Sequence, residues 1–204
     1  MSKKTSFDVG KFYQHYPRIA VIVTARSGER ENAMAASWNS PLSMDPPLFG
    51  VGISLKRFTY KLVLESGEFG VCFVPMEKAN LIAEVGATKG AETDKFKTLK
   101  IAREKPVRTS VPLLKDAYLS YECKVEAHHT TGDHEWFVGR IVAVHHEEGS
   151  LTDKELLDLK RVRPALYLGA DTYVTAAPES LLFIDREPIR QKYGGGPGGG
   201  RKAS

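Results

Sequence analysis

The apolar residues of this chain gather in short runs that turn-forming residues separate. Short β-branched runs are typical of buried strands, whereas apolar residues spaced three or four apart are typical of helices. On this basis we predict strands over residues 18–25, 32–39, 48–53, 69–74, 117–128, 136–146 and 163–168. We predict helices over residues 58–65, 78–85 and 151–159.

Two stretches between these elements are expected to be irregular. Pro41, Pro46 and Pro47 argue against regular structure before Leu48, because proline cannot donate a backbone hydrogen bond. Residues 86–107 are polar and show no clear period. The predicted strands do not alternate regularly with helices, which argues against a parallel sheet and favours a mainly β fold with an antiparallel barrel.

The chain has 204 residues, 42% of them hydrophobic, which is enough for one well-buried domain. We expect an N-terminal arm over residues 1–15, a barrel domain over 16–175 and a C-terminal extension over 176–193. The glycine-rich residues 194–204 are expected to be disordered. They neither follow a strand nor open a helix, so they do not form a phosphate-binding loop.

The net charge of +4 invites the hypothesis of a nucleic-acid partner. Four cations near the termini account for that charge, and the remainder is about neutral: Lys3, Lys4, Arg201 and Lys202. A nucleic-acid binder usually shows a basic stripe with aromatic residues inside the fold. The sequence has no such stripe, so we expect no nucleic-acid partner.

The two cysteines, Cys72 and Cys123, both lie in apolar runs with no second cysteine nearby. They lack the spacing of a zinc site, and we expect buried free thiols in a reducing compartment. The N-terminal residues contain no apolar signal region, and no stretch approaches the roughly 18 apolar residues of a membrane span. We therefore expect a cytoplasmic protein without a membrane partner.

Three segments contain more polar and charged side chains than the core of a barrel requires. Residues 32–39 combine small residues with a serine and a tryptophan, which suits a flat ring lying on a strand edge, although apolar packing within a strand is the default use of such a run. Residues 54–60 run into a helix start with two cations and two hydroxyl groups, which suits a phosphate or an exposed basic turn. Residues 132–136 place His134 at the start of a strand. There it could carry a proton, or it could be an ordinary solvated polar residue of a turn.

Two histidine pairs, His128-His129 and His145-His146, raise the possibility of a metal site. Adjacent strand residues point to opposite faces, so neither pair alone can chelate one metal. Pairing of the two dipeptides across a hairpin stays open, but no ligand spacing supports it, and we predict no metal site.

Taken together, these segments resemble the flavin reductase-like, FMN-binding split-barrel family, and within it the flavoredoxin type. The resemblance runs from about Tyr16 to Tyr173 and depends on several motifs in the right order: Asn32 to Trp38, Pro46-Pro47-Leu48, Ser54 to Tyr60, Glu68 to Phe73, Asp94-Lys95-Phe96, Gly132-Asp133-His134 and Leu166-Tyr167-Leu168-Gly169. It implies an antiparallel Greek-key split β-barrel with peripheral helices. It also implies a homodimer with non-covalent FMN at the interface.

The resemblance assigns roles to ten residues. Asn32, Ala36, Ser37 and Trp38 would contact the ring and ribityl parts of FMN, and Ser54, Arg57 and Thr59 would hold its phosphate. Lys95 would reach the cofactor, Tyr167 would close the pocket, and His134 would lie beside the ring as the candidate catalytic residue.

The implied activity is an NAD(P)H-dependent flavin oxidoreductase, with NADH or NADPH as the electron donor. The alternatives are a flavoredoxin-like electron-transfer protein that serves a redox partner protein, and an FMN-binding protein without turnover. A pyridoxamine-phosphate-oxidase-like enzyme on a related barrel fits the segment from Asn32 to Trp38 less well.

Overall fold

The protein is described by a computed structural model that places residues 2–193. Its strands are β1 (Arg18–Ile19), β2 (Val21–Ser27), β3 (Arg30–Ala36), β4 (Asn39–Met44), β5 (Pro47–Ser54), β6 (Glu68–Phe73), β7 (Arg103–Glu104), β8 (Leu113–Leu114), β9 (Leu119–Thr131), β10 (His134–His146), β11 (Leu166–Gly169) and β12 (Thr172–Val174). Its helices are η1 (Tyr13–His15), α1 (Phe58–Ser66), η2 (Met76–Lys78), α2 (Ala79–Ala87), α3 (Lys95–Thr98), η3 (Pro178–Ser180) and α4 (Glu187–Tyr193).

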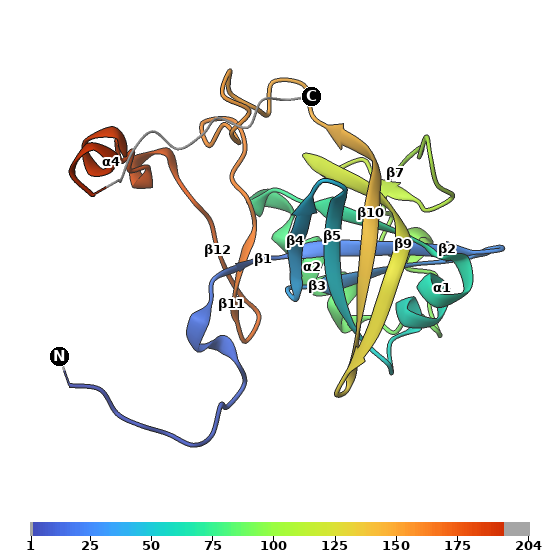
Figure 1. Ribbon diagram of the computed structural model, residues 1–204. Coiled ribbons are helices and arrows are strands. Elements are labelled where there is room, and N and C mark those ends of the chain that lie inside the picture. Colours follow the sequence, from blue (N-terminus) through green and yellow to red (C-terminus); the bar gives the residue numbers. More distant parts are fainter. Residues whose placement is uncertain (1, 194–204) are drawn as a thin grey trace.

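Seven strands form one antiparallel sheet in the order β3-β2-β6-β9-β10-β5-β4 (Figure 1). Three of its neighbouring pairs are hairpins, while β2–β6, β6–β9 and β10–β5 join strands that are distant in sequence. The two ends of the sheet approach each other, because only Ser37 and Trp38 separate β3 from β4 and β3 also contacts β5. This arrangement confirms the predicted antiparallel split barrel with peripheral helices.

The apolar strand β2 is buried on both faces, which explains why its sequence does not alternate. Val21 and Val23 point into the barrel, where they meet Phe69, Phe137 and the inner face of α1. Ile22 points the other way and packs in a second core with α2 and the segment that ends at Leu114. Side chains on a strand alternate between faces, so an all-apolar strand needs a core on each side.

Most predicted elements are confirmed, with shifts of a few residues at their ends. The predicted strand over residues 32–39 is instead two elements, since β3 ends at Ala36 and β4 begins at Asn39. The polar segment 86–107 contains the short helix α3 and the strand β7. These two elements have only four and two residues, too few for a periodic sequence pattern.

The expectation of irregular structure from Pro41 to Pro47 is wrong. Residues 39–44 form β4, which pairs with β5 and lies at the edge of the sheet. An edge strand tolerates proline because one side of its backbone needs no partner. The pairing is irregular between Pro41 and Ser43, as expected where a donor is missing.

The predicted helix over residues 151–159 is also wrong. This segment folds back on itself through a bridge between Leu151 and Leu157. The Thr152 hydroxyl accepts from the Leu156 amide, and the Asp158 amide donates to the Ser150 carbonyl. Local side-chain bonds of this kind compete with helix formation, and the exposed Leu156 gains no buried face to stabilise a helix.

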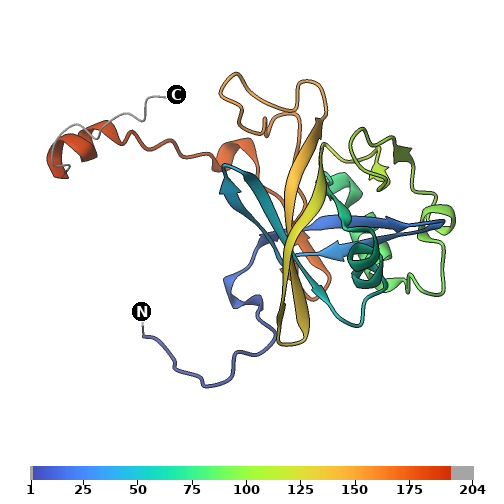
Figure 2. The ribbon, with the colours of Figure 1, turned by 45° about the vertical axis from the view of Figure 1, so that its right-hand side comes forward.

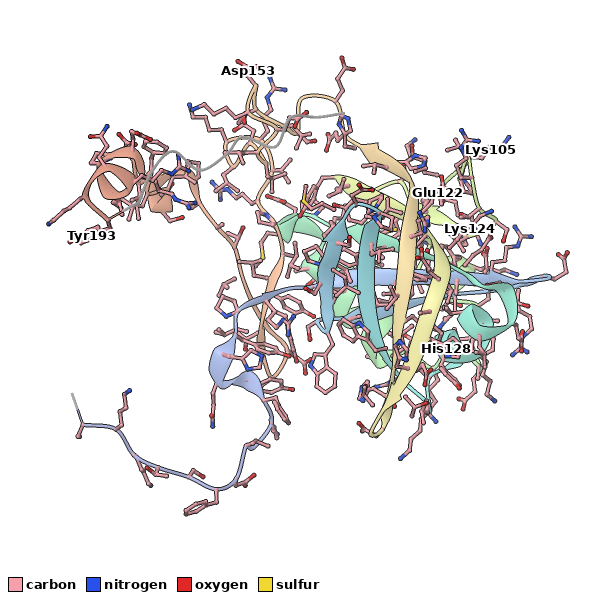
Figure 3. The ribbon with its side chains drawn as sticks, viewed as in Figure 1. Lys105, Glu122, Lys124, His128, Asp153 and Tyr193 are labelled. Carbon is pink, nitrogen blue, oxygen red and sulfur yellow. The ribbon has the colours of Figure 1, made fainter. Side chains whose placement is uncertain are left out.

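The pairing of the two histidine dipeptides across the hairpin, which the sequence left open, does not form. His128 lies opposite Phe137 and His145 lies opposite Ser120, so the two dipeptides occupy opposite ends of β9 and β10. Figure 3 shows His128 at one end of this ribbon and Glu122, the partner of His145, toward the other. Among residues 2–193 no group of three or more possible metal ligands is found.

Glu122 is a fully buried carboxylate that fixes the loop before β8 to the sheet. It accepts hydrogen bonds from the backbone amides of Val107, Arg108 and Thr109 at 2.7 to 2.9 Å, and His145 Nε2 lies 2.7 Å away. Burial alone would raise its pKa, but these partners together lower it to about 2. The loop that covers the outer core is therefore held by charge-assisted hydrogen bonds.

Cys72 and Cys123 are buried free thiols on β6 and β9, as predicted. Within residues 2–193, no helix is long and apolar enough to cross a membrane. The expected domain boundaries at residues 16 and 175 stay predictions, and residues 194–204 lie outside the described part of the chain.

Candidate functional site

A continuous groove runs along β3, outside the barrel. Three adjoining hollows make up this groove, and both Ala35 and Arg57 line all three. One end of the groove is bordered by the start of α1 and the segment after α2. The other end is bordered by β11, the start of β10 and the residues around η1. Elements from four distant parts of the sequence therefore meet at this site.

The floor of the groove is flat because β3 presents small side chains there. Ala35 and Ala36 line the middle, and Gly52 of the neighbouring β5 lines the aromatic end. A Cβ atom at Gly52 would lie 3.2 Å from the Trp136 ring and 3.3 Å from the Trp38 Cβ. The backbone can approach closely only because that side chain is absent.

One end of the groove is strongly cationic. Four basic residues line it, together with the hydroxyls of Thr59 and Thr88 and a single acidic residue, Glu92: Lys56, Arg57, Lys89 and Lys95. Arg57 and Thr59 stand at the N-terminus of α1, where free amide groups and the helix dipole favour an anion. This end suits a phosphate group, which an arginine can bind through two N–H groups.

Lys95 is buried at this cationic end. Its side chain is 3% exposed, and its Nζ donates to the carbonyls of Ala33 and Val85 at 2.8 and 2.6 Å. Burial, with a smaller contribution from the Arg57 guanidinium, lowers its pKa from 10.5 to about 8. An ammonium group has three donors, so one remains for a further acceptor.

Asn32 contributes a buried acceptor without a partner to the same hollow. Its Nδ2 donates a 2.8 Å hydrogen bond to Thr59 Oγ1, whereas its Oδ1 has no partner. Gly90 lies directly against this amide, because a Cβ there would come within 2.2 Å of Oδ1. Buried acceptors normally have a hydrogen-bond donor, so this oxygen favours a ligand that offers one.

The opposite end of the groove is aromatic. Trp38 stacks on His134 with ring centres 4.5 Å apart, and its Nε1 donates to the Tyr16 hydroxyl at 3.2 Å. That hydroxyl also lies 3.2 Å from Ser37 Oγ, while Tyr167 packs edge-on against Tyr16. These rings form an apolar wall with several hydroxyl groups at its edge.

His134 is positioned by its neighbour in sequence. Its Nδ1 lies 2.7 Å from the Asp133 carboxylate, which fixes the ring and leaves Nε2 as the free nitrogen. This hydrogen bond, followed by the charge interaction with the same ring, lowers the pKa of Asp133. The hydrogen bond to Asp133 therefore fixes the orientation of the imidazole at the wall of the groove.

All ten residues assigned from the resemblance line this one groove. The cationic hollow contains Asn32, Thr59 and Lys95, the aromatic hollow contains Trp38, Ser54 and His134, and the shared middle contains Ala36, Ser37, Arg57 and Tyr167. The structure places Lys95 at the phosphate-like end, in a different hollow from His134. The binding roles of these residues stay predictions.

Sequence reasoning missed several groove residues. Tyr13 and Tyr16 were assigned to the arm or its boundary, although they pack on Tyr167 and border the aromatic hollow. Lys89 was also missed, in the segment expected to be irregular. The density of aromatic residues just before Pro17 was the one available signal for this wall.

Three comparisons place this fold among known proteins. An FMN-binding protein from Thermus thermophilus, solved with 1-cyclohex-2-enone, is 38% identical with a TM-score of 0.79, and the match covers 89% of this chain and 99% of that one. A flavoredoxin from Methanosarcina acetivorans is 25% identical with a TM-score of 0.80, over 92% and 100% of the two chains. An NADH-dependent flavin reductase from a Rhodococcus species is 26% identical over 64% of this chain and 71% of its own length.

The family comparison covers the barrel and both ends of the groove. Residues 13–173 match the flavin reductase like domain, from the aromatic residues of η1 to Tyr173 of β12, which lines the middle of the groove. The chain belongs to the flavin reductase-like family.

Proposed function

We propose that this chain binds FMN non-covalently along the groove and transfers hydride to it from NADH or NADPH. The observation that supports this best is the order of chemically different surfaces along the groove. A cationic end with an unpartnered acceptor is joined by a small-residue floor to an aromatic end. FMN has the same order of parts: a phosphate, a polyol chain and a flat ring.

The unpartnered Asn32 Oδ1 provides a specific test of this fit. A ribityl hydroxyl can donate to it, whereas a phosphate dianion beside it would interact with the free Nζ donor of Lys95 and with Arg57. A small anion such as free phosphate would satisfy the cations and leave Asn32 unpaired. A polyol phosphate satisfies both groups, so the residues present fit FMN.

The aromatic end would position the reacting ring. Trp38 and Tyr167 supply flat apolar surface, and Ser37 and Ser54 supply hydroxyl groups at its border. His134, held by Asp133, presents its free Nε2 to a polar group of the ring edge or of the nicotinamide. Bound FMN supplies the hydride-accepting chemistry, while these side chains bind, orient and exclude water.

The similar proteins support both the cofactor and the donor. The protein from T. thermophilus is FMN-binding and the Rhodococcus relative is an NADH-dependent flavin reductase. By analogy we assign FMN as the cofactor of this chain and a reduced nicotinamide as its donor.

The likeness to a flavoredoxin favours a second candidate function. In that case the chain would hold FMN tightly and take electrons from a redox partner protein. The same groove serves both functions, because each needs FMN held at a wall that a donor can reach.

We also propose that the protein is a homodimer with the groove at the interface, and that it is cytoplasmic. Trp38, at the aromatic end of the groove, remains 36% exposed, as expected of a site that a second copy completes. The two free buried thiols fit a reducing compartment.

Anaerobic titration tests the proposal. The FMN-loaded protein is mixed with NADH or NADPH and the flavin absorbance near 450 nm is followed, a region in which oxidised flavins absorb. Rapid bleaching identifies a nicotinamide-dependent reductase and its donor. Bleaching by dithionite alone supports the electron-transfer function, and a chain that fails to bind added FMN contradicts both.

A further inference from the structure

The segment that follows β12 contains an apolar run that its own chain does not cover. Four consecutive side chains are 70%, 81%, 85% and 59% exposed: Leu181, Leu182, Phe183 and Ile184. The helix α4 after them has no buried residue, and its Tyr193 is 74% exposed. Contiguous exposed apolar surface of this kind marks a contact with another molecule.

The N-terminal segment shares this property and leaves the molecule on the same side. Phe7 is fully exposed and Val9 is 59% exposed. Figures 1 and 2 both show the two terminal segments extending away from the barrel, on the side opposite α1. Figure 3 shows Tyr193 far from the rest of the barrel side chains.

Both segments begin at the walls of the groove. Tyr13 and Tyr16 border its aromatic hollow, and Tyr173 of β12 borders the adjoining one. Phe12 meets Trp38 edge-on, with ring centres 6.3 Å apart. These two rings, which we call the Phe12–Trp38 rim, remain 48% and 36% exposed. The rim therefore offers exposed aromatic surface beside the groove, near the points at which both terminal segments leave the barrel.

A second copy of the chain fits these observations best. An aromatic side chain such as Phe183 buries roughly 150–250 Å², so the run Leu181 to Ile184 can supply a substantial part of the roughly 800 Å² that each partner of a standard interface buries. Six residues lie between Val174 and Leu181, and three of them form η3, so this segment can span up to about 20 Å, away from its own barrel. In a two-fold dimer the same segment and the same rim occur on both copies, so one contact is made twice.

We propose that residues Leu181 to Ile184 of one copy pack against the Phe12–Trp38 rim of a second copy and thereby help to retain its flavin. This inference rests on the proposed function, since the rim borders the groove assigned to FMN. The segment acts as an exchanged arm, which makes each site depend on the neighbouring chain.

Thiol cross-linking tests the contact directly. A chain with Phe183→Cys is co-expressed with a differently tagged chain with Phe12→Cys and treated with a short thiol-specific cross-linker, since both native cysteines are buried. A cross-linked heterodimer is expected. In the matched control, Leu64→Cys replaces Phe12→Cys, because Leu64 is 47% exposed on α1 at the opposite side. Cross-linking with Leu64→Cys but not with Phe12→Cys would overturn the contact.

Flavin release tests the consequence. The double variant Leu182→Asp/Phe183→Asp should lose FMN at least about fivefold faster than the unmodified chain, because charged residues cannot pack against the apolar rim. A chain that ends at Tyr193 keeps the apolar run and should release FMN at the original rate. Its mass by light scattering should remain that of a dimer.

The outcomes separate this inference from the proposed function. If the double variant releases FMN at an unchanged rate, the arm contact is wrong and the proposed function stands. If the unmodified chain binds FMN but is monomeric, the arm contact and the proposed homodimer are both wrong, and only the proposed FMN-dependent activity stands. If the unmodified chain binds no FMN, the proposed function itself fails.

Discussion

The side-chain nitrogen Nδ2 of Asn32 donates a 2.8 Å hydrogen bond to the hydroxyl of Thr59, and this bond joins β3 to the first turn of α1. Both residues are almost fully buried, and the Oδ1 of Asn32 is left without a partner in the groove. This bond holds Asn32 so that its free Oδ1 can accept from a polyol hydroxyl. The bond comes from Thr59 at the N-terminus of α1, where a phosphate would bind.

Removal of the Thr59 hydroxyl should therefore weaken flavin binding. In Thr59→Val the Asn32 amide loses its acceptor and is free to rotate, so we expect FMN affinity to fall about 10-fold, the effect of roughly one hydrogen bond. Fluorescence titration with FMN measures this change. Thr130→Val is the matched control, since Thr130 donates to Glu135 and lines none of the three hollows of the groove. Equal losses in the two variants would contradict the assigned role of Thr59.

Arg57 should distinguish FMN from riboflavin. In Arg57→Gln we expect FMN affinity to fall roughly 10- to 100-fold, because a charge-assisted pair with the phosphate is lost. Riboflavin, which has no phosphate, should bind with unchanged affinity. Arg140→Gln serves as a control, because Arg140 pairs with Glu126 on the β9–β10 ribbon. A similar loss for both ligands would place Arg57 away from the phosphate.

The stability of the apoprotein should rise with pH between about 8 and 10.5. The folded pKa of Lys95 is about 8 and its ordinary value is 10.5. In this window the unfolded chain binds more protons, so the free energy of unfolding increases with pH by up to about 3 kcal/mol. Urea unfolding of the native chain and of Lys95→Met measures the difference. A rise of the same size in both chains would show that Lys95 is not its source.

Glu122 should change the free energy of unfolding at acidic pH. Its folded pKa of about 2 lies below the ordinary 4.5, so its stabilising contribution is present above pH 4.5 and is lost as the pH falls toward 2. We expect Glu122→Gln to be about 3 kcal/mol less stable at pH 7 and to lack this acid-dependent loss. Glu126→Gln, which removes an exposed ion pair, should change stability by less than about 1 kcal/mol. If the free energy of unfolding of Glu122→Gln still falls between pH 4.5 and 2 as it does in the native chain, this assignment is wrong.

His134 should affect hydride transfer more than flavin binding. In His134→Gln we expect the anaerobic rate of flavin reduction by NADH to fall roughly 10- to 100-fold, which corresponds to the loss of about one hydrogen bond to a charged group. FMN affinity should change by less than about threefold, because the phosphate end is untouched. His129→Gln on the same hairpin, opposite Trp136, is the control. An unchanged reduction rate would remove His134 from the reaction.

The sequence by itself determined most of the sheet and much of the groove. The runs that became β2, β6 and β10 are apolar enough to predict buried strands from hydrophobicity alone, and the spacing in residues 58–65 predicts α1. The ten residues assigned from the family resemblance share one groove because the barrel brings their motifs together. Local pattern and family motif were sufficient where each element buries its own apolar face.

Only the tertiary structure decided the elements whose stability comes from distant partners. Pro41 is acceptable in β4 because that strand lies at the sheet edge, and strand order is not encoded in the local pattern. Residues 151–156 are exposed and only Leu157 of this segment packs against the core, so local hydrogen bonds prevail over a helix there. The aromatic wall likewise depends on Tyr16 meeting Trp38 and Tyr167, contacts that form only when η1, β3 and β11 converge.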